Sequence, residues 1–169
     1  GYTYTLSGGG RAIQSCLEDY LIEKVKGREL GDWNRIWEEI WHSTHRLGRG
    51  ITVMALSALD IAAWDLRAKQ ANLPLYKYIG AYREKVPAYG SGRSTHQMST
   101  EELVAGSRSY VEEGYRAVKL RVGKWSPEED VARVRAVREA LGPDIRIMVD
   151  CNERLDYPTA LWLGQQLEQ

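Results

Sequence analysis

Residues 117–152 read AVKLRVGKWSPEEDVARVRAVREALGPDIRIMVDCN. Apolar and polar residues alternate from Ala117 to Val122 and again from Ile145 to Asn152, which is typical of strands. Between these segments, a capping box with proline at the first helical position predicts a helix that begins after Ser126 and ends at Gly142. A strand, a helix and a second strand at this spacing predict a parallel βαβ unit.

The same alternation of elements continues on both sides of this stretch. Val86–Ser91 is typical of a short strand with a glycine-containing exit, and a second capping box at Ser99 predicts a helix that ends near Gly114. Beyond the second strand, Asp156 is expected to begin a further helix. The pattern therefore places residues 85–169 in the α/β class.

The first half of the chain has mainly helical patterning. Tyr2–Leu6 is rich in strand formers, whereas Ile13–Val25 and Thr52–Gln70 carry apolar residues at helical spacing. The second of these helices should end before Pro74, and because it is apolar almost all round we expect it to pack between other elements. Asp32 is expected to cap another helix, whose apolar stripe carries three tryptophans. Packing in a core or an interface is the simpler interpretation of these residues, Trp33, Trp37 and Trp41.

Composition and charge exclude several classes of protein. The 169 residues contain 23 Lys and Arg against 23 Asp and Glu, so the chain lacks the positive charge that nucleic-acid binding requires. Cys16 and Cys151 are isolated, which argues against a disulfide framework or a zinc knuckle. No apolar run is long enough to cross a bilayer and no secretion signal is present at the start. We therefore expect a cytoplasmic protein with no nucleic-acid or membrane partner.

The two ends of the sequence suggest a fragment. Since the sequence begins at Gly1 without Met and stops at Gln169 inside a helical pattern, we expect a piece of a longer protein.

Charged groups follow one face of the two predicted strands. Lys119 and Arg121 share a face of the first strand, and Asp150 and Asn152 share a face of the second. The C-terminal ends of parallel strands are where α/β proteins bind ligands, and buried charges require partners. The pattern favours a polar site there, and a structural ion pair of Asp150 with Lys119 or Arg121 is the alternative interpretation.

Five stretches, taken in order along the chain, resemble the mandelate racemase and muconate-lactonizing branch of the enolase superfamily. They are residues 1–5 (GYTYT), 55–66 (ALSALDIAAWDL), 86–89 (VPAY), 114–123 (GYRAVKLRVG) and 149–152 (VDCN). The resemblance implies a partial (β/α) TIM-type barrel preceded by part of an α+β capping domain. We accordingly expect a capping domain over residues 1–84, with its N-terminal strands partly missing, and the first three βα units of a truncated barrel over residues 85–169.

The resemblance also implies roles for individual residues. Asp150 matches the first of three acidic Mg²⁺ ligands, and Asn152 matches a position that faces the substrate carboxylate or the surroundings of the metal. Lys119 and Arg121 match a Lys-x-Lys pair in which the second lysine is usually the base and the first stabilises the substrate carboxylate. Ser91 ends the first barrel strand, where a polar group can reach the substrate.

The sequence departs from that pattern at Arg121. A guanidinium seldom gives up its proton, so Arg121 is a poor general base and is better suited to orienting a carboxylate through two hydrogen bonds. We expect the working base to be a His on a later strand, with Lys119 as the second choice. His96, in the loop after the first barrel strand, is a candidate for substrate contact. His42 and His45 are expected to be solvated helix residues rather than metal ligands.

The resemblance therefore predicts a fragment of a Mg²⁺-dependent enzyme that removes the proton α to a carboxylate and stabilises the enediolate. Dehydration of a sugar acid, aldonic or aldaric, is the favoured reaction, and a racemase, epimerase or cycloisomerase is the alternative within the superfamily. We expect the fragment alone to be inactive and the protein to be a homo-oligomer. Two alternatives outside this class are a receiver-like α/β module that accepts phosphate on Asp150, and a degenerate relative kept for assembly.

Overall fold

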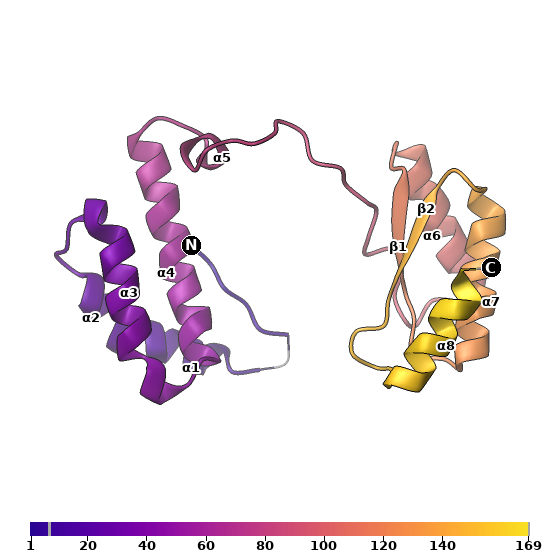
Figure 1. Ribbon diagram of the computed structural model, residues 1–169, viewed down its shortest axis with the longest axis horizontal. Coiled ribbons are helices and arrows are strands. Elements are labelled where there is room, and N and C mark those ends of the chain that lie inside the picture. The colour runs from indigo at the N-terminus through magenta and orange to yellow at the C-terminus, as the bar shows by residue number, and fades with distance from the viewer. Residues whose placement is uncertain (7, 169) are drawn as a thin grey trace. The chain divides into compact units, whose positions relative to one another are not determined.

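A computed structural model describes residues 1–6 and 8–168 (Figure 1). The chain forms two compact units, Gly1–Glu84 and Lys85–Gln169. Each unit has a hydrophobic core of its own. Within the described residues, no helix combines the length and the apolar character needed to cross a membrane.

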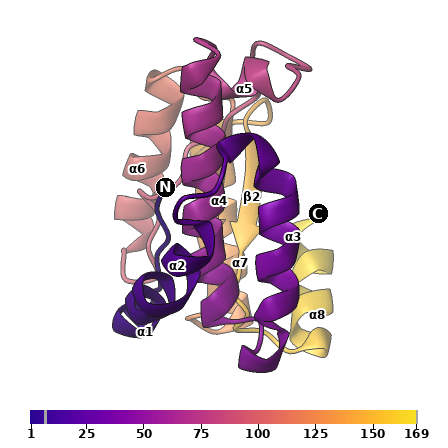
Figure 2. The same ribbon diagram turned by 90° about the vertical axis from the view of Figure 1, so that its left-hand side faces the viewer.

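The first unit consists of helices (Figure 2). One continuous helical run contains α1 (Gly10–Ser15), the π-helical segment η1 (Cys16–Leu21) and α2 (Ile22–Val25). It is followed by η2 (Leu30–Asp32), α3 (Trp33–Ser43), η3 (His45–Leu47), α4 (Ile51–Gln70) and α5 (Leu75–Tyr78). The three longer helices that the sequence predicts in this half of the chain are therefore confirmed, and α3 packs beside α4.

The tryptophans of α3 serve packing, as their spacing predicts. Trp33 is buried in the core of the first unit, where its indole N–H donates a hydrogen bond to the Asp60 carboxylate at 2.7 Å. The rings of Trp37 and Trp41 stack with centroids 5.2 Å apart. The hydrogen bond from Trp33 accounts for the Asp60 carboxylate in the middle of α4. Asp60 thus has a structural role.

Two local predictions for the first unit need correction. Tyr2–Leu6 forms no strand, because none of the described segments pairs with its backbone, and it lies instead along α4. Asp32 stands at the N-cap of α3, but its carboxylate makes no cap hydrogen bond and binds the Arg35 guanidinium. The prediction that α4 packs between other elements is confirmed, because α4 contacts α1, η1, α3 and α5, although Leu66 stays half exposed.

The second unit alternates helices and strands. Its elements are α6 (Thr100–Glu112), β1 (Ala117–Arg121), α7 (Pro127–Leu141), β2 (Arg146–Asp150) and α8 (Tyr157–Leu167). Strands β1 and β2 are parallel, with Arg121 opposite Asp150 in the register. Ser99 and Ser126 both complete the predicted capping boxes, and the Asp156 carboxylate caps α8 through the Thr159 backbone N–H.

The segment Val86–Ser91, predicted as a strand, is reduced to a single bridge. Gly90 pairs in parallel with Val118, donating its N–H to the Ala117 carbonyl and accepting from the Lys119 N–H, both at 2.9 Å. Close packing explains the glycine, because a Cβ at this position would lie 2.3 Å from Cγ of Tyr110. The bridge nevertheless places this segment beside β1, where a first strand is expected.

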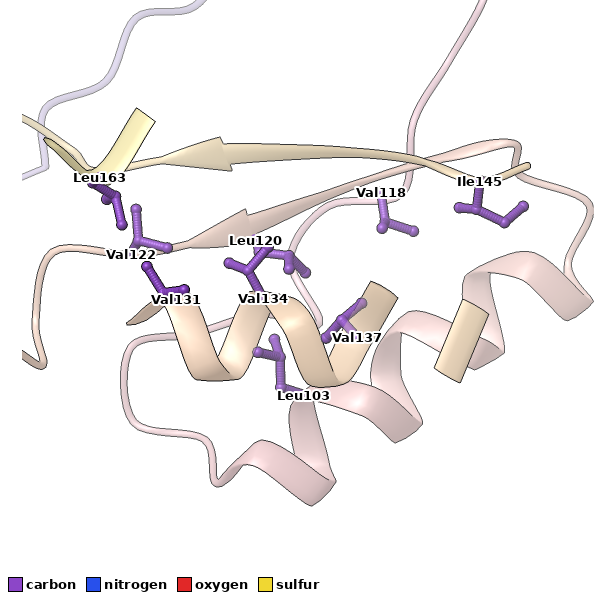
Figure 3. Packing of buried hydrophobic residues seen from close by; sticks show 9 residues of the cluster. All are labelled: Leu103, Val118, Leu120, Val122, Val131, Val134, Val137, Ile145 and Leu163. Atoms are coloured by element: carbon purple, nitrogen blue, oxygen red, sulfur yellow. The ribbon is translucent and has the colours of Figure 1, made fainter. Parts of the chain in front are cut away.

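The core of the second unit lies between the sheet and its helices. Figure 3 shows the buried side chains of β1 directed toward α7 and α6, with Val134 and Val137 of α7 beneath Leu120. The apolar face of β1 predicted by alternation is confirmed, because Val118, Leu120 and Val122 are all buried. The opposite face of β1 is consequently left to Lys119 and Arg121, and this is what positions the candidate site.

Candidate active site

Lys119 and Asp150 meet on the polar face of the two strands. The Lys119 Nζ donates to the Asp150 Oδ2 at 2.9 Å, and the two side chains are 23% and 30% exposed. The parallel register explains the contact, because it places Lys119 opposite Met148, which is two residues before Asp150 and on the same face of β2. Both interpretations of the sequence, a site and a structural ion pair with Lys119 or Arg121, agree with this contact.

The ion pair fixes the charge of both groups. The hydrogen bond to Asp150 raises the pKa of Lys119, and that same bond lowers the pKa of Asp150, with the Asn152 N–H as its second cause. Lys119 therefore carries a proton at neutral pH and suits charge stabilisation better than proton abstraction. Arg121 adds positive charge nearby, which lowers the pKa of Asp150 further.

A tight turn after β2 completes the surroundings of Asp150. The Asn152 backbone N–H donates to the Asp150 Oδ1 at 3.0 Å. Asn152 and Glu153 both have left-handed backbones, with φ of 45° and 62°. Asparagine tolerates this conformation, whereas a glutamate there is unfavourable, and such local strain is concentrated at functional sites. The turn holds Asp150 by its backbone and leaves the Asn152 side chain exposed.

Two polar residues of the loop after Gly90, Ser91 and Arg93, make structural contacts in this chain. Ser91 is exposed, and the contact that fixes it is a hydrogen bond from the Tyr110 hydroxyl to its carbonyl. Arg93, which makes this loop polar, turns toward α6 and binds Ser109 and Glu113. Arg93 is therefore occupied by structural contacts.

Ser94 is a residue that sequence reasoning missed. It is 4% exposed, and its Oγ accepts a hydrogen bond from the Arg121 backbone N–H at 3.0 Å. The side chain of Arg121 is exposed and forms no ion pair with any described residue. Ser94 thus fixes the backbone of Arg121 while the guanidinium stays available to a ligand. No sequence signal distinguishes Ser94 from the other polar residues of the loop.

A buried polar cluster lies beneath the same loops. The Asp130 carboxylate on α7 is 0% exposed, and its Oδ2 accepts from the Gly123 N–H at 2.6 Å. Arg133, one turn further along α7, donates to the Met98 carbonyl at 2.9 Å. Burial raises the pKa of Asp130. Through these two residues, α7 holds both the loop after Gly90 and the turn that follows β1.

His96 faces this cluster and the ends of the strands. Both of its ring nitrogens are buried, and neither has a hydrogen-bond partner among the described residues. Burial is the main cause that lowers the pKa of His96, and the positive charges of Arg154 and Arg121 lower it further. His96 is therefore neutral at pH 7. His96 lies near Asn152 and Arg121, and neither of its ring nitrogens is exposed to solvent.

The donor set at this site fits part of a hard-cation site. Asp150 offers two carboxylate oxygens, each accepting one hydrogen bond, so each keeps a lone pair for a cation. Hard cations take six or more oxygen ligands, however, and no group of three His, Cys, Asp or Glu residues within 1–6 and 8–168 could hold a metal ion. His42 and His45 are exposed on the surface of the first unit, so the prediction that they are solvated is confirmed.

Two family models match the chain. The model described as "Mandelate racemase / muconate lactonizing enzyme, N-terminal domain" matches residues 1–80, and the model described as "Enolase C-terminal domain-like" matches residues 102–169. The chain belongs to the mandelate racemase and muconate-lactonizing branch of the enolase superfamily. The predicted resemblance is confirmed, as is the fold class of a partial barrel preceded by part of a capping domain.

Individual relatives have several activities. The chain is 34% identical over 170 residues to L-talarate/galactarate dehydratase of Salmonella typhimurium, matching 100% of this chain and 42% of the relative. It is 37% identical over 168 residues to 3,6-anhydro-alpha-L-galactonate cycloisomerase of Streptomyces coelicolor, with 99% and 46% covered. A crystal structure of a racemase from Streptomyces coelicolor with bound magnesium superposes with a TM-score of 0.94 at 35% identity, with 99% and 50% covered. The chain thus spans half or less of the length of these relatives.

Proposed function

We propose that the whole protein is a Mg²⁺-dependent dehydratase that removes the proton α to the carboxylate of a sugar acid and expels a β-hydroxyl group. The observation that carries this proposal is the accessible Lys119–Asp150 pair at the C-terminal ends of parallel strands, 2.9 Å apart. The proposal includes the domain assignment, with a capping domain over residues 1–84 and the first barrel units over residues 85–169. The described residues supply only part of such a site, so the chain by itself should be inactive.

Each residue of the site has a separate task in this proposal. Asp150 would be one of the Mg²⁺ ligands, and the bound cation would offset negative charge that develops on the substrate carboxylate. Lys119 stays protonated beside Asp150 and adds positive charge at the same place. Arg121 would orient the carboxylate through two parallel hydrogen bonds, because its guanidinium is free to do so and cannot act as a base. Ser91, Asn152 and His96 would border the substrate.

The proton acceptor is proposed to be a histidine on a later strand. When it takes the α-proton, the electrons of the broken C–H bond move into the carboxylate and form an enediolate. Collapse of the enediolate breaks the C–O bond at the β-carbon, and the departing hydroxide leaves as water once it is protonated. The resulting enol tautomerises to a 2-keto acid. Lys119 is the second choice as base, although its ion pair with Asp150 disfavours that role.

The relatives support a sugar acid as substrate. The names of the Salmonella dehydratase and the Streptomyces cycloisomerase both include a sugar acid. Racemisation or cycloisomerisation is the alternative within the superfamily, because both would begin with the same α-proton abstraction. Family membership argues against a receiver-like module, because a domain of this family accounts for residues 1–80. The proposal also includes a cytoplasmic location and a homo-oligomer, which fractionation and light scattering would test.

The experiment is a substrate screen in heavy water. The full-length protein with Mg²⁺ is incubated with aldonic and aldaric acids, and NMR and a keto-acid assay report α-deuterium exchange and dehydration. Exchange together with keto-acid formation is expected for at least one sugar acid. Exchange without keto acid would indicate a racemase or epimerase instead. The absence of both across the panel, with Mg²⁺ bound, would point to a degenerate relative kept for assembly.

A further inference from the structure

A second arginine lies close to Arg121 on the neighbouring loop. Gly123, two residues after Arg121, has φ of 89°, and a Cβ at this position would lie 3.2 Å from Cβ of Arg154 and 3.3 Å from the Cys151 carbonyl. Cβ of Arg154 and the Cys151 carbonyl therefore lie against the turn that follows β1. This contact brings the two guanidinium-bearing segments, from different strands, to the same edge of the sheet.

The turn beneath Arg154 is held from the interior. The fully buried Asp130 accepts from the Gly123 N–H at 2.6 Å, and the Val122 N–H donates to the Asp150 carbonyl at 3.1 Å. On the other side, the Arg154 N–H closes its own turn on the Cys151 carbonyl at 3.1 Å. Both arginines thus project from fixed backbone, which lowers the entropy lost when they bind a ligand.

Arg121 and Arg154 are two cations at this edge that form no ion pair with a described side chain. Lys119 is already paired with Asp150, whereas neither Arg121 nor Arg154 forms an ion pair within the part of the chain that the structure describes. Glu153 is adjacent to Arg154 in sequence and forms no ion pair with it. Both guanidinium groups also act on His96, whose pKa they lower, so their fields overlap there. Two exposed cations held near each other favour binding of an anion.

We propose that Arg154 binds the distal carboxylate of a dicarboxylic sugar acid, whose reacting carboxylate lies at Lys119, Arg121 and Asp150. The inference rests on the proposed function and selects aldaric over aldonic acids as substrates. The reacting carboxylate requires no more than the first three groups, so Arg154 is in excess for a monoacid. A second carboxylate matches the planar donors of its guanidinium, whereas the terminal hydroxyl of an aldonic acid would leave that charge unpaired.

The test compares two ligands that differ only at the distal carbon. Galactarate and galactonate have the same configuration, but the first ends in a carboxylate and the second in a hydroxymethyl group. Their dissociation constants are measured calorimetrically with full-length protein and Mg²⁺, for the wild type and for Arg154→Gln. Galactarate should bind the wild type more tightly, and the variant should lose about 10- to 100-fold in galactarate affinity, as expected for a charge-assisted contact. Galactonate affinity should not change.

Two further variants separate the subsite from a general charge effect. Arg154→Lys should retain part of the preference for galactarate, because it keeps the charge without the planar donors. Arg146→Gln, at the opposite end of β2, removes the same charge and should leave both affinities unchanged. An equal loss for both ligands in Arg154→Gln, or no loss for galactarate, would overturn the subsite while α-proton exchange showed the proposed function intact. No binding of either acid, together with no exchange across the panel of sugar acids, would overturn both.

Discussion

The hydrogen bond between the buried Asp130 and Gly123 can be tested by two substitutions that separate its charge from its geometry. Asp130→Asn keeps an oxygen that can accept the Gly123 N–H, whereas Asp130→Ala removes the acceptor and leaves that N–H buried and unpaired. A lost partner of this kind costs about 1–3 kcal/mol. Opening of the turn should therefore be about 5- to 150-fold more frequent in the alanine variant than in the asparagine variant.

Hydrogen exchange of the peptide that spans Gly123, followed by mass spectrometry on the full-length protein, measures this opening directly. The wild type and Asp130→Asn should protect the amide, and Asp130→Ala should exchange it faster while peptides of α6 remain unchanged. If the alanine variant protected Gly123 as well as the asparagine variant, the turn would be held by something other than Asp130. The arrangement of Arg154 over that turn would then need another explanation.

The pH dependence of the same pair gives a second readout. Burial raises the pKa of Asp130 in the folded protein, so the folded state binds this proton more tightly than the unfolded state does. The contribution of Asp130 to stability is therefore largest below the usual carboxyl pKa of about 3.9 and is lost as the pH rises through the raised value. Asp130→Asn should lack this loss, so its stability relative to the wild type should increase between acidic and neutral pH. Urea unfolding across that range measures the difference, and a difference that stays constant with pH would contradict the argument.

Three further predictions concern the scaffold of the second unit. Gly90→Ala should destabilise this unit by about 1–3 kcal/mol, because the new Cβ would overlap the Tyr110 ring. Gly164→Ala, in the middle of α8 where a Cβ meets no other atom, should instead stabilise the unit by about 0.5–1 kcal/mol. Thermal unfolding of the two variants should show opposite shifts, and a stable Gly90→Ala protein would contradict the close packing. Ser126→Ala should cost about 1 kcal/mol through the lost cap, and Ser126→Asp should restore most of it in the same assay. Leu120→Ala should cost about 2–5 kcal/mol in urea unfolding, since this side chain is buried against α7, and a cost near zero would argue against that core.

The sequence predicts best those features that depend on local pattern. Alternation along β1 identifies Lys119 and Arg121 as a polar face, and a capping box needs only a serine and a glutamate three residues later. The contact of Lys119 with Asp150 also follows from pattern, because a parallel βαβ unit brings the ends of its strands together. These features required no knowledge of the remaining structure.

Features that depend on tertiary partners could not be predicted in the same way. Tyr2–Leu6 has strand formers but no described segment pairs with it, and a strand requires a partner for its backbone. Asp130 follows two other acidic residues in the first turn of α7, where acidic side chains favour the helix dipole, so its burial is invisible in the sequence. Arg93 is polar in a polar loop, and only the fold shows that it turns toward Glu113 instead of the site.

The central claim is that Asp150 belongs to a cation site rather than to a structural ion pair, and Mg²⁺ binding tests it most directly. Calorimetric titration of the full-length protein should show Mg²⁺ binding that Asp150→Asn weakens by at least about tenfold. Asp156→Asn, which changes a carboxylate six residues further along the chain but preserves the cap of α8, should bind Mg²⁺ as the wild type does. Equal Mg²⁺ affinity in the wild type and in Asp150→Asn would contradict the account.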